Sequence, residues 1–180
     1  MRFPHDKACD EALICIAKGD RSALSVLFHA YGRLIYLVAL DTVHQKQSAE
    51  DVVQEVMLRV LKYAASYRPG TNPRAWVLKI TRHCALDHLK HYPHADPLPE
   101  QPLPAPSEDP DEGLMLSMTL RTLPEEDQLL IRLHLHAGLT HREVGSVMGL
   151  SETAVRKRYE RALTKLRVCL NDEEGGRDDE

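Results

Sequence analysis

Aromatic residues and glycine are scarce in this sequence. Phe, Trp and Tyr make up 5% of the chain, and only 9 of its 180 residues are glycine. Ala, Leu, Glu, Lys and Arg are abundant instead, and these residues have high intrinsic helix propensity. The composition therefore predicts an all-α protein with little or no β-sheet.

Long apolar runs and metal-binding cysteine pairs are also missing. No uninterrupted apolar stretch approaches the roughly 18 residues that a membrane-spanning helix needs. Residues 1–7 lack the apolar core of a signal peptide. The cysteines form no CxxC motif, which argues against a zinc site or a disulfide framework: Cys9, Cys15, Cys84 and Cys169. We therefore expect a cytoplasmic protein with reduced thiols, no cofactor and no membrane insertion.

The chain has no overall excess of positive charge, because its formal net charge is −4. The distribution of charge is more informative than the sum. Residues 53–92 contain seven Lys and Arg against two acids, and residues 141–170 contain seven against three, so their local charges are +5 and +4. Segments 93–112 and 171–180 contain six acids each. Two basic modules fit nucleic-acid binding, although charge alone fits solvated helix faces equally well.

A proline-rich segment divides the chain. Seven of the twenty residues at 93–112 are proline, which removes backbone donors and clashes inside helices. An extended acidic linker is expected there, between a helical domain at 1–92 and a second one at 113–170. The second domain is predicted to open with a short helix at 114–121. The acidic residues 171–180 are expected to form a disordered tail.

Apolar residues of the first domain recur at steps of three and four, the spacing of amphipathic helices. Helices are predicted at 10–18, at 24–38, after a capping residue at Ser48, and from 74 to about 92, with a loop at 66–73. In the helix after Ser48, one side is an apolar stripe: Val52, Val53, Val56, Met57, Val60 and Leu61. Its other side presents Asp51, Gln54, Glu55, Leu58 and Arg59.

The second domain has the pattern of a helix-turn-helix motif. A helix is predicted over 124–136, with proline and acidic residues at its start. Thr140 and Glu143 have the spacing of a capping box and open a short helix. After a glycine-containing turn, Ser151 caps a final helix that is expected to end near residue 170. A short helix, a turn and a longer helix in this order are typical of DNA-binding domains.

The final predicted helix has an apolar side and a basic side. Val155, Tyr159, Ala162 and Leu166 recur at steps of four, three and four residues, so they face inward together. A helix fits the major groove, where Arg and Lys donate to guanine and Glu accepts from cytosine. The candidate contacts to duplex DNA are Thr153, Arg156, Lys157, Arg158, Glu160 and Arg161.

Two segments resemble domains of bacterial RNA polymerase sigma factors. Residues 123–167, LPEEDQLLIRLHLHAGLTHREVGSVMGLSETAVRKRYERALTKLR, are similar to the domain that binds the promoter −35 element. Residues 49–92, AEDVVQEVMLRVLKYAASYRPGTNPRAWVLKITRHCALDHLKHY, are similar to the domain that binds the −10 element and the polymerase. These two domains, joined by a short linker, are the plan of the extracytoplasmic-function (ECF) group. The resemblance implies a non-enzymatic subunit that directs core RNA polymerase to promoter DNA, commonly controlled by an anti-sigma factor.

The resemblance implies a polymerase-binding role for one side of the first domain. In the family, an Asp-x-x-Gln-Glu helix docks on the largest catalytic subunit of the polymerase. The corresponding residues here, with two neighbours that extend the surface, are Asp51, Gln54, Glu55, Leu58 and Arg59. Polar groups around an exposed apolar residue are a plausible rim and anchor for such an interface.

The loop at 66–73 and the helix after it occupy the family's −10 position, where an unpaired base is captured and the separated strand is held. Trp76 shares an apolar stripe with Ile80 and is expected in the core. The family often has Asn and Arg where this chain has His83 and Lys90. The candidate contacts to the −10 strand are Tyr67, Asn72, Lys79, Arg82, His83 and Lys90.

Three other functions are possible from parts of the sequence, and each is less well supported. An enzyme is disfavoured, because the chain has no Gly-rich phosphate loop, no HExxH motif and no nucleophile elbow. A metal sensor would use His134, His136 and His141, but the first two lie about 200° apart on a helix and no acid or thiol completes a ligand set. A conventional helix-turn-helix regulator, which binds duplex DNA without joining polymerase, explains the second domain and leaves the first unexplained.

Overall fold

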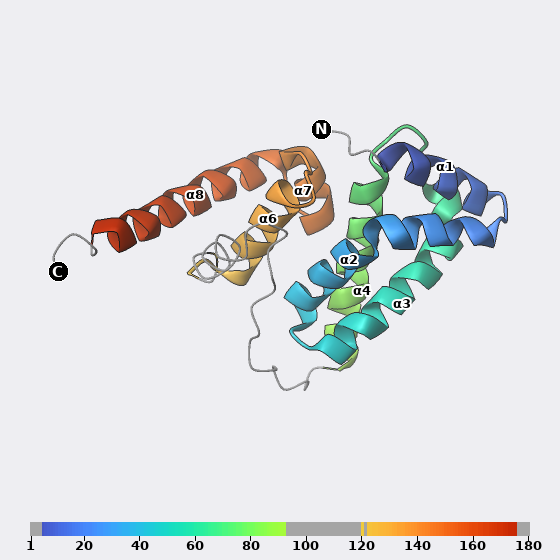
Figure 1. The fold of residues 1–180 in the computed structure, drawn as a ribbon, viewed down its shortest axis with the longest axis horizontal. Coiled ribbons are helices and arrows are strands. Elements are labelled where there is room, and N and C mark those ends of the chain that lie inside the picture. The colour runs from blue at the N-terminus through green and yellow to red at the C-terminus, as the bar shows by residue number, and fades with distance from the viewer. Residues whose placement is uncertain (1–4, 93–119, 121, 176–180) are drawn as a thin grey trace. The chain divides into compact units, whose positions relative to one another are not determined.

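The computed structural model describes residues 5–92, 120 and 122–175, with side chains as far as residue 168. Every regular element within these ranges is a helix, as the composition predicts (Figure 1). The chain divides into two compact units: the first holds the helices up to residue 92, and the second holds most of the helical residues from 120 onward. The predictions for the linker at 93–112, for most of the helix at 114–121 and for the tail residues 176–180 lie outside the described residues.

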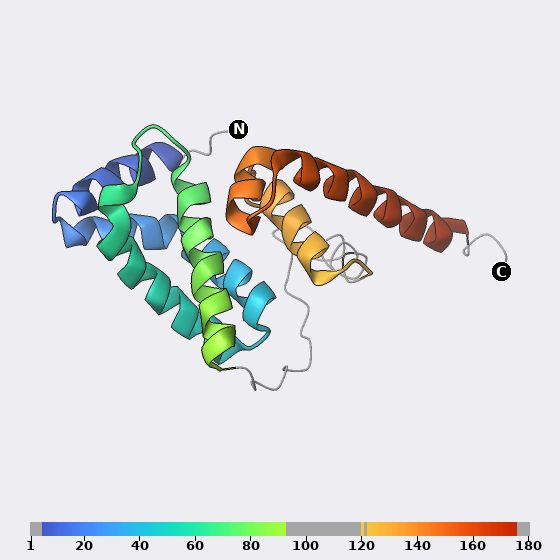
Figure 2. The same ribbon diagram turned by 180° about the vertical axis from the view of Figure 1, so that it is seen from behind.

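The first unit is a bundle of α-helices with two short 3-10 turns. α2 packs against both α3 and α4, α3 and α4 pack on each other, and α1 lies against α2 (Figures 1 and 2). Asp20 caps the η1 turn, because its carboxylate accepts from the backbone N–H of Ser22 at 3.0 Å. The elements are α1 (Asp6–Ala17), η1 (Arg21–Ala23), α2 (Leu24–Val43), α3 (Lys46–Tyr63), η2 (Ala64–Ser66) and α4 (Pro73–His91).

Two helix starts differ from the sequence-based prediction. α1 begins at Asp6 rather than at residue 10. α3 begins at Lys46, so the prediction of Ser48 as its capping residue is wrong. Gln45 is extended at the start of α3, and the backbone N–H of Ala49 donates to the Gln45 carbonyl at 2.9 Å, which places Ser48 inside the first turn. The Ser48 hydroxyl is buried there and donates to Gln45 Oε1 at 2.5 Å.

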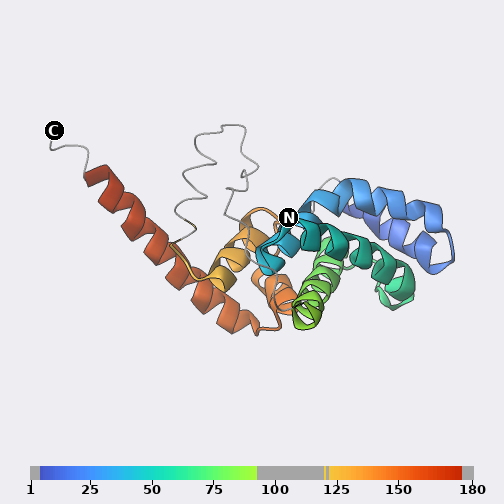
Figure 3. The same ribbon diagram turned by 90° about the horizontal axis from the view of Figure 1, so that it is seen from below.

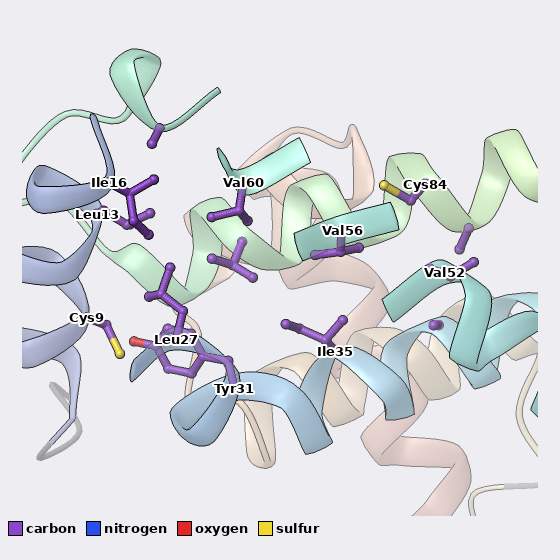
Figure 4. Close-up of a cluster of buried hydrophobic side chains, with 14 of the residues drawn as sticks. Cys9, Leu13, Ile16, Leu27, Tyr31, Ile35, Val52, Val56, Val60 and Cys84 are labelled. Atoms are coloured by element: carbon purple, nitrogen blue, oxygen red, sulfur yellow. The ribbon is translucent and has the colours of Figure 1, made fainter. Parts of the chain in front are cut away.

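Aliphatic side chains from α1, α2 and α3 form the core of the first unit (Figure 4). Leu13, Leu27, Ile35 and Val56 are fully buried there. Each buried side chain of this size stabilises the folded state by about 1.5–3 kcal/mol relative to exposure. Trp76 is partly buried and packs against the same cluster, as its position in the apolar stripe predicts.

Among the described residues, one helical stretch, residues 21–43, is long and apolar enough by length and composition to cross a membrane. It is not an uninterrupted apolar run, because polar residues that include Arg33 and Asp41 interrupt it. This stretch comprises η1 and α2, the helix that contacts α1, α3 and α4. Its apolar side faces the protein core, where Leu27 and Ile35 are fully buried.

The second unit contains the predicted helix-turn-helix. The predicted capping box is present: Thr140 Oγ1 accepts from the Glu143 backbone N–H at 3.3 Å, and Glu143 Oε2 accepts from the Thr140 backbone N–H at 2.8 Å. The predicted cap at Ser151 is also present, because its hydroxyl accepts from the Ala154 backbone N–H at 3.2 Å. The elements are α6 (Glu125–Leu135), α7 (His141–Met148) and α8 (Glu152–Gly175).

The last helix is longer than the sequence suggests. α8 continues to Gly175, so residues 171–175 are helical rather than part of a disordered tail. Glu173 and Glu174 have high helix propensity, and no proline or glycine precedes Gly175 in this helix. Figure 3 shows α8 as one continuous helix that extends beyond the N-terminal end of α6.

Candidate nucleic-acid interface

α3 presents an exposed polar side opposite its buried valines. Four of the five residues predicted for polymerase binding lie on this side, and their spacing of three, four and seven residues places them on one helix surface. All four are exposed to solvent: Asp51, Gln54, Glu55 and Leu58. Leu58 is 62% exposed, so an apolar side chain stands among polar neighbours. This arrangement can serve as a protein interface with an apolar anchor and a polar rim.

The fifth residue, Arg59, is engaged within the unit. Its Nε donates to Glu55 Oε1 at 2.7 Å, and its Nη1 donates to Asp87 Oδ2 on α4 at 3.1 Å. Lys90 Nζ lies 3.5 Å from the other oxygen of Asp87. The hydrogen bond to Glu55 raises the pKa of Arg59, and the hydrogen bond from Arg59 lowers the pKa of Asp87. Arg59 therefore orients Glu55 and joins α3 to α4.

A groove of about 920 Å³ lies between the start of α3 and the end of α4. Asp51 and Glu55 are among the α3 residues that line it, and Asp87, His88 and His91 are among those of α4. Burial raises the pKa of the Cys84 thiol in this groove to about 11. Since Asp51 and Glu55 belong both to the groove and to the exposed side of α3, the groove extends the candidate protein interface.

Two predicted −10 contacts have structural roles. Tyr67 is only 6% exposed; its hydroxyl donates to Asp10 Oδ1 at 2.5 Å, and its ring meets the Trp76 ring edge-on at 5.6 Å. The Asn72 side chain accepts from the backbone N–H groups of Arg74 and Ala75 and so caps α4. Neither side chain is fully exposed to solvent: Tyr67 is buried and Asn72 is partly buried. Both side chains stabilise the conformation of the loop through their hydrogen bonds.

The exposed part of this loop is formed by residues that the sequence analysis did not select. Arg68 and Thr71 are exposed, and the Thr71 hydroxyl donates to the Arg68 carbonyl at 2.7 Å. Gly70 between them adopts a φ of 79°, a conformation that favours glycine. The Pro-Gly pair at 69–70 is the signal that could have identified this tight, exposed turn.

The remaining −10 candidates lie along α4. Lys79, His83 and Lys90 are exposed and share one helix side, since they are separated by four and seven residues. Arg82 is half-buried beside them and has interactions of its own. The structure thus brings Lys79, His83 and Lys90 together as a partly basic stripe on the same unit as the loop.

The outer side of α8 carries most of the predicted −35 contacts. Five of the six candidates are exposed on one face: Thr153, Arg156, Lys157, Glu160 and Arg161. Val155, Ala162 and Leu166 are buried on the opposite face. A basic, exposed surface on the second helix of a helix-turn-helix has the shape and charge to enter the major groove.

Arg158, the sixth candidate, is engaged with α6. Its Nε donates to Asp127 and its Nη1 to Glu126, both at 2.8 Å. These bonds raise the pKa of Arg158, chiefly through Glu126. Helical periodicity places Arg158 beside the buried face of α8 rather than among the exposed cations. The sequence alone could therefore have predicted that Arg158 is not a surface contact. Its guanidinium holds the two helices together.

Tight packing sets the turn between α7 and α8. A Cβ at Gly145 would stand 2.6 Å from the carbonyl oxygen of Leu150, closer than any side chain can approach. The backbone N–H of Leu150 donates to the Gly145 carbonyl at 2.9 Å. Gly149 ends α7 with a φ of 73°. Both glycines are therefore required by the geometry of the motif.

Three aromatic rings connect the helices of the second unit. His134 stacks on His141 with 4.7 Å between ring centroids, and both rings contact Tyr159 of α8. The Nδ1 atom of His134 lies 2.7 Å from the Leu139 carbonyl. Among the described residues, no group of three or more His, Cys, Asp or Glu side chains is placed to hold a metal ion. The cluster therefore packs the motif.

The fold and these surfaces define a class of protein. One helical unit has an exposed leucine among polar side chains on α3 and a partly basic stripe on α4. The other is a helix-turn-helix whose second helix exposes a row of cations. This combination defines a two-domain, all-helical transcription factor.

The comparisons identify the family. The family models of Sigma-70 region 2 and Sigma-70 region 4 match residues 27–92 and 119–168. The ECF RNA polymerase sigma factor ShbA of Streptomyces griseus is 33% identical over 133 residues, which cover 66% of this chain and 70% of ShbA. SigE of Mycolicibacterium smegmatis, also an ECF sigma factor, is 29% identical over 86% of this chain. The chain belongs to the ECF RNA polymerase sigma factors.

The chain spans 65% of the length of SigE and 40% of the length of RfaY of Xanthomonas campestris, a probable RNA polymerase sigma factor. The match to region 2 covers residues 27–92 of the first unit, which a conventional helix-turn-helix regulator leaves unexplained.

Solved structures have the same fold. CnrH, solved in complex with the cytosolic domain of CnrY, matches with a TM-score of 0.66 and 24% identity over 92% of this chain and 98% of CnrH. The sigma factor RpoE of Bartonella quintana, solved with the anti-sigma factor NepR, matches with a TM-score of 0.63 and 18% identity over 80% of this chain and 94% of RpoE.

Proposed function

We propose that this protein binds core RNA polymerase and directs it to promoters that contain −10 and −35 elements, without a catalytic activity of its own. The observation that carries the proposal is the pairing of a region 2 unit, with an exposed anchor on α3, and a region 4 unit, with a row of exposed cations on α8. The site of action would be the cytoplasm, where the polymerase works, without membrane insertion or a cofactor.

The polymerase contact is assigned to the exposed side of α3. Leu58 is the apolar anchor, because burying a side chain that is 62% exposed in the free protein yields a hydrophobic gain on binding. Asp51, Gln54 and Glu55 form the polar rim. Arg59 supports this surface by holding Glu55 through the 2.7 Å hydrogen bond.

The −35 contact is assigned to duplex DNA in the major groove. Arg156, Lys157 and Arg161 supply positive charge at the exposed face of α8, and Glu160 can accept from cytosine. Thr153 lies in the first turn of α8, the part of a recognition helix that reaches base edges. Counterion release makes such binding weaken as salt rises.

The −10 contact is assigned to the loop and the outer side of α4. Lys79, His83 and Lys90, with Arg82 beside them, form a stripe that can hold the phosphates of a separated strand. Tyr67 and Asn72 support this contact indirectly: Tyr67 bonds to Asp10, and Asn72 caps α4. Base capture at this loop would offset part of the cost of unpairing.

A protein inhibitor is the third expected partner. RpoE of Bartonella quintana was solved in complex with the anti-sigma factor NepR, and RpoE shares its fold with this chain. The groove between α3 and α4 is a suitable surface for such an inhibitor, because it overlaps the proposed polymerase contact. Occupation of the groove would then exclude the polymerase.

The test is transcription from a library of host DNA fragments by purified core polymerase, with and without the protein. New discrete start sites are expected only in its presence. Charge reversal of Asp51 and Glu55 to Lys should abolish them. The control is Glu50→Lys, which makes one such charge reversal at an exposed neighbour on α3, and each single variant, Asp51→Lys and Glu55→Lys, is compared with it. Duplex binding without polymerase binding or new transcripts would reject the proposal and indicate a conventional regulator.

A further inference from the structure

Two carboxylates of α1 hold both ends of the loop before α4. Asp10 Oδ1 accepts from the Tyr67 hydroxyl at 2.5 Å and from the backbone N–H of Gly70 at 2.9 Å. Both oxygens of Asp6 accept from Arg74 Nη2, at 3.0 and 2.8 Å. Asp6 and Asp10 are four residues apart, so they lie on one side of α1.

The contact of Asp6 is structural. Its side chain and that of Arg74 are 5% and 4% exposed, so the ion pair is buried. The Tyr31 hydroxyl also donates to Asp6, at 2.9 Å, and the ring of Tyr31 reaches across the core toward α1 (Figure 4). Arg74 lies in the first turn of α4, where the helix dipole disfavours a cation, so it depends on this carboxylate. The pair docks α1 on α4.

The contact of Asp10 acts on the exposed turn itself. The N–H of Gly70 is directed at the Asp10 carboxylate, and Gly70 lies between the exposed residues Arg68 and Thr71. The Tyr67 hydroxyl, held by Asp10, also lies 3.2 Å from the Thr71 carbonyl. The Asp10 carboxylate therefore holds two points of the turn, Tyr67 at its start and Gly70 near its middle. A hydrogen bond to a carboxylate is stronger than one between neutral groups.

We propose that Asp10 is a positioning residue for capture of the −10 strand: it holds residues 67–71 so that Arg68 and Thr71 face the unpaired bases. The inference rests on the proposed function, since it names what orients the loop of that same site. α1 precedes residues 27–92, which match Sigma-70 region 2. The role thus falls to a helix outside the matched segment.

The test uses full-length protein in holoenzyme with core polymerase, on a promoter fragment mapped with the wild type. Reactivity of thymines to permanganate reports strand opening. Asp10→Ala removes two hydrogen bonds to a charged acceptor and should lower opening at least about tenfold. Asp10→Asn keeps a neutral acceptor oxygen for Tyr67 and Gly70, so its opening should lie between that of wild type and that of Asp10→Ala. Affinity for core polymerase and for a duplex with only the −35 element should not change.

Asp20→Ala is the matched control, because it removes a carboxylate that caps η1 and does not touch the loop. It should open promoters at the wild-type level. Tyr67→Phe loses only the donated hydroxyl and should show a partial defect in opening. Hydrogen exchange measures the contact without DNA: the Gly70 amide should exchange about tenfold faster in Asp10→Ala than in wild type.

Equal opening by Asp10→Ala and Asp20→Ala at matched folded fraction would overturn the inference, as would an Asn variant as defective as the Ala variant. An unchanged exchange rate at Gly70 would do the same even if Asp10→Ala were too unstable to assay with polymerase. Failure of the wild-type holoenzyme to open any promoter would reject the proposed function and this inference with it. That result is visible in the wild-type sample alone, so the two failures are distinguishable.

Discussion

Arg59 on α3 donates to Asp87 on α4 over 3.1 Å, while the same guanidinium donates to Glu55 over 2.7 Å. One side chain thus connects a residue of the proposed polymerase contact with the helix that carries the proposed −10 contacts. α3 and α4 also pack on each other. The two surfaces therefore lie on helices that pack on each other, and we expect a change at Arg59 to affect both surfaces.

The first prediction concerns the pH dependence of this bridge. Arg59 lowers the pKa of Asp87, so the bridge stabilises the fold above the ordinary aspartate pKa of about 3.9 and is lost as pH falls through the lower, folded value. At pH 7, Asp87→Asn should reduce the free energy of unfolding by about 0.5 kcal/mol, a small value because Asp87 is partly exposed. Urea unfolding of both proteins should show the gap closing at acidic pH. A gap that does not narrow as the pH falls below the ordinary aspartate pKa of about 3.9 contradicts the assignment to Asp87.

The second prediction concerns the turn of the helix-turn-helix. Gly145→Ala should destabilise the second unit by about 1–3 kcal/mol, because the added Cβ meets the Leu150 carbonyl oxygen. Ser146→Ala, an exposed neighbour on α7, is the control and should change stability by less than about 0.5 kcal/mol. Trp76 is the chain's single tryptophan and lies in the first unit, so its fluorescence transition should not move while the circular dichroism transition does. Equal stability of the two variants would contradict the prediction, because it would mean that the backbone around Leu150 moves away from the added Cβ at little cost.

Much of the fold is predictable from local sequence. The capping box of Thr140 and Glu143, the cap at Ser151 and the apolar stripe of α3 each depend on residues within a few positions of one another. Ser48 shows the limit of such reasoning. It is a common capping residue, but the helix starts at Lys46, where Gln45 takes the extended conformation and Ser48 becomes buried.

The candidate site was less predictable because several of its residues have partners far away in the sequence. Tyr67 bonds to Asp10, and Arg158 bonds to Glu126 and Asp127. A sequence motif can mark such residues as candidates for binding DNA or polymerase. It does not show whether their side chains instead bond to other residues of the same protein. Exposed residues in regular spacing, such as Asp51 and Glu55 on α3, are easier to identify because helical periodicity alone places them.

The third prediction concerns thiol reactivity. Cys15 is exposed, whereas Cys9 and Cys84 are buried and burial raises the pKa of both thiols, that of Cys84 to about 11. Since the thiolate is the reactive form, iodoacetamide at pH 8 should label Cys15 long before the other two. Mass spectrometry of the peptides measures each rate, and labelling in urea is the control for intrinsic reactivity. Labelling of Cys84 as fast as Cys15 in native buffer would mean that the groove between α3 and α4 opens readily.

The last prediction separates two arginines of α8. Arg161 is exposed on the face assigned to DNA, so Arg161→Ala should weaken duplex binding and reduce the slope of log affinity against log salt by about one. Arg158 is bound to α6 through Glu126 and Asp127. Arg158→Ala should therefore lower the stability of the second unit by about 1 kcal/mol and leave the salt slope unchanged at temperatures where the unit is folded.

Fluorescence anisotropy titrations at four salt concentrations measure the salt slope of DNA affinity for each variant. Thermal melts measure the stability of each variant. Glu126→Gln is an additional control, because it weakens the same bridge without removing a cation from α8. It should reproduce the stability loss of Arg158→Ala in part and bind DNA with the wild-type slope. A reduced slope for Arg158→Ala would show that its guanidinium leaves α6 to contact phosphate when DNA binds, and the helix-bracing role would then belong only to the free protein.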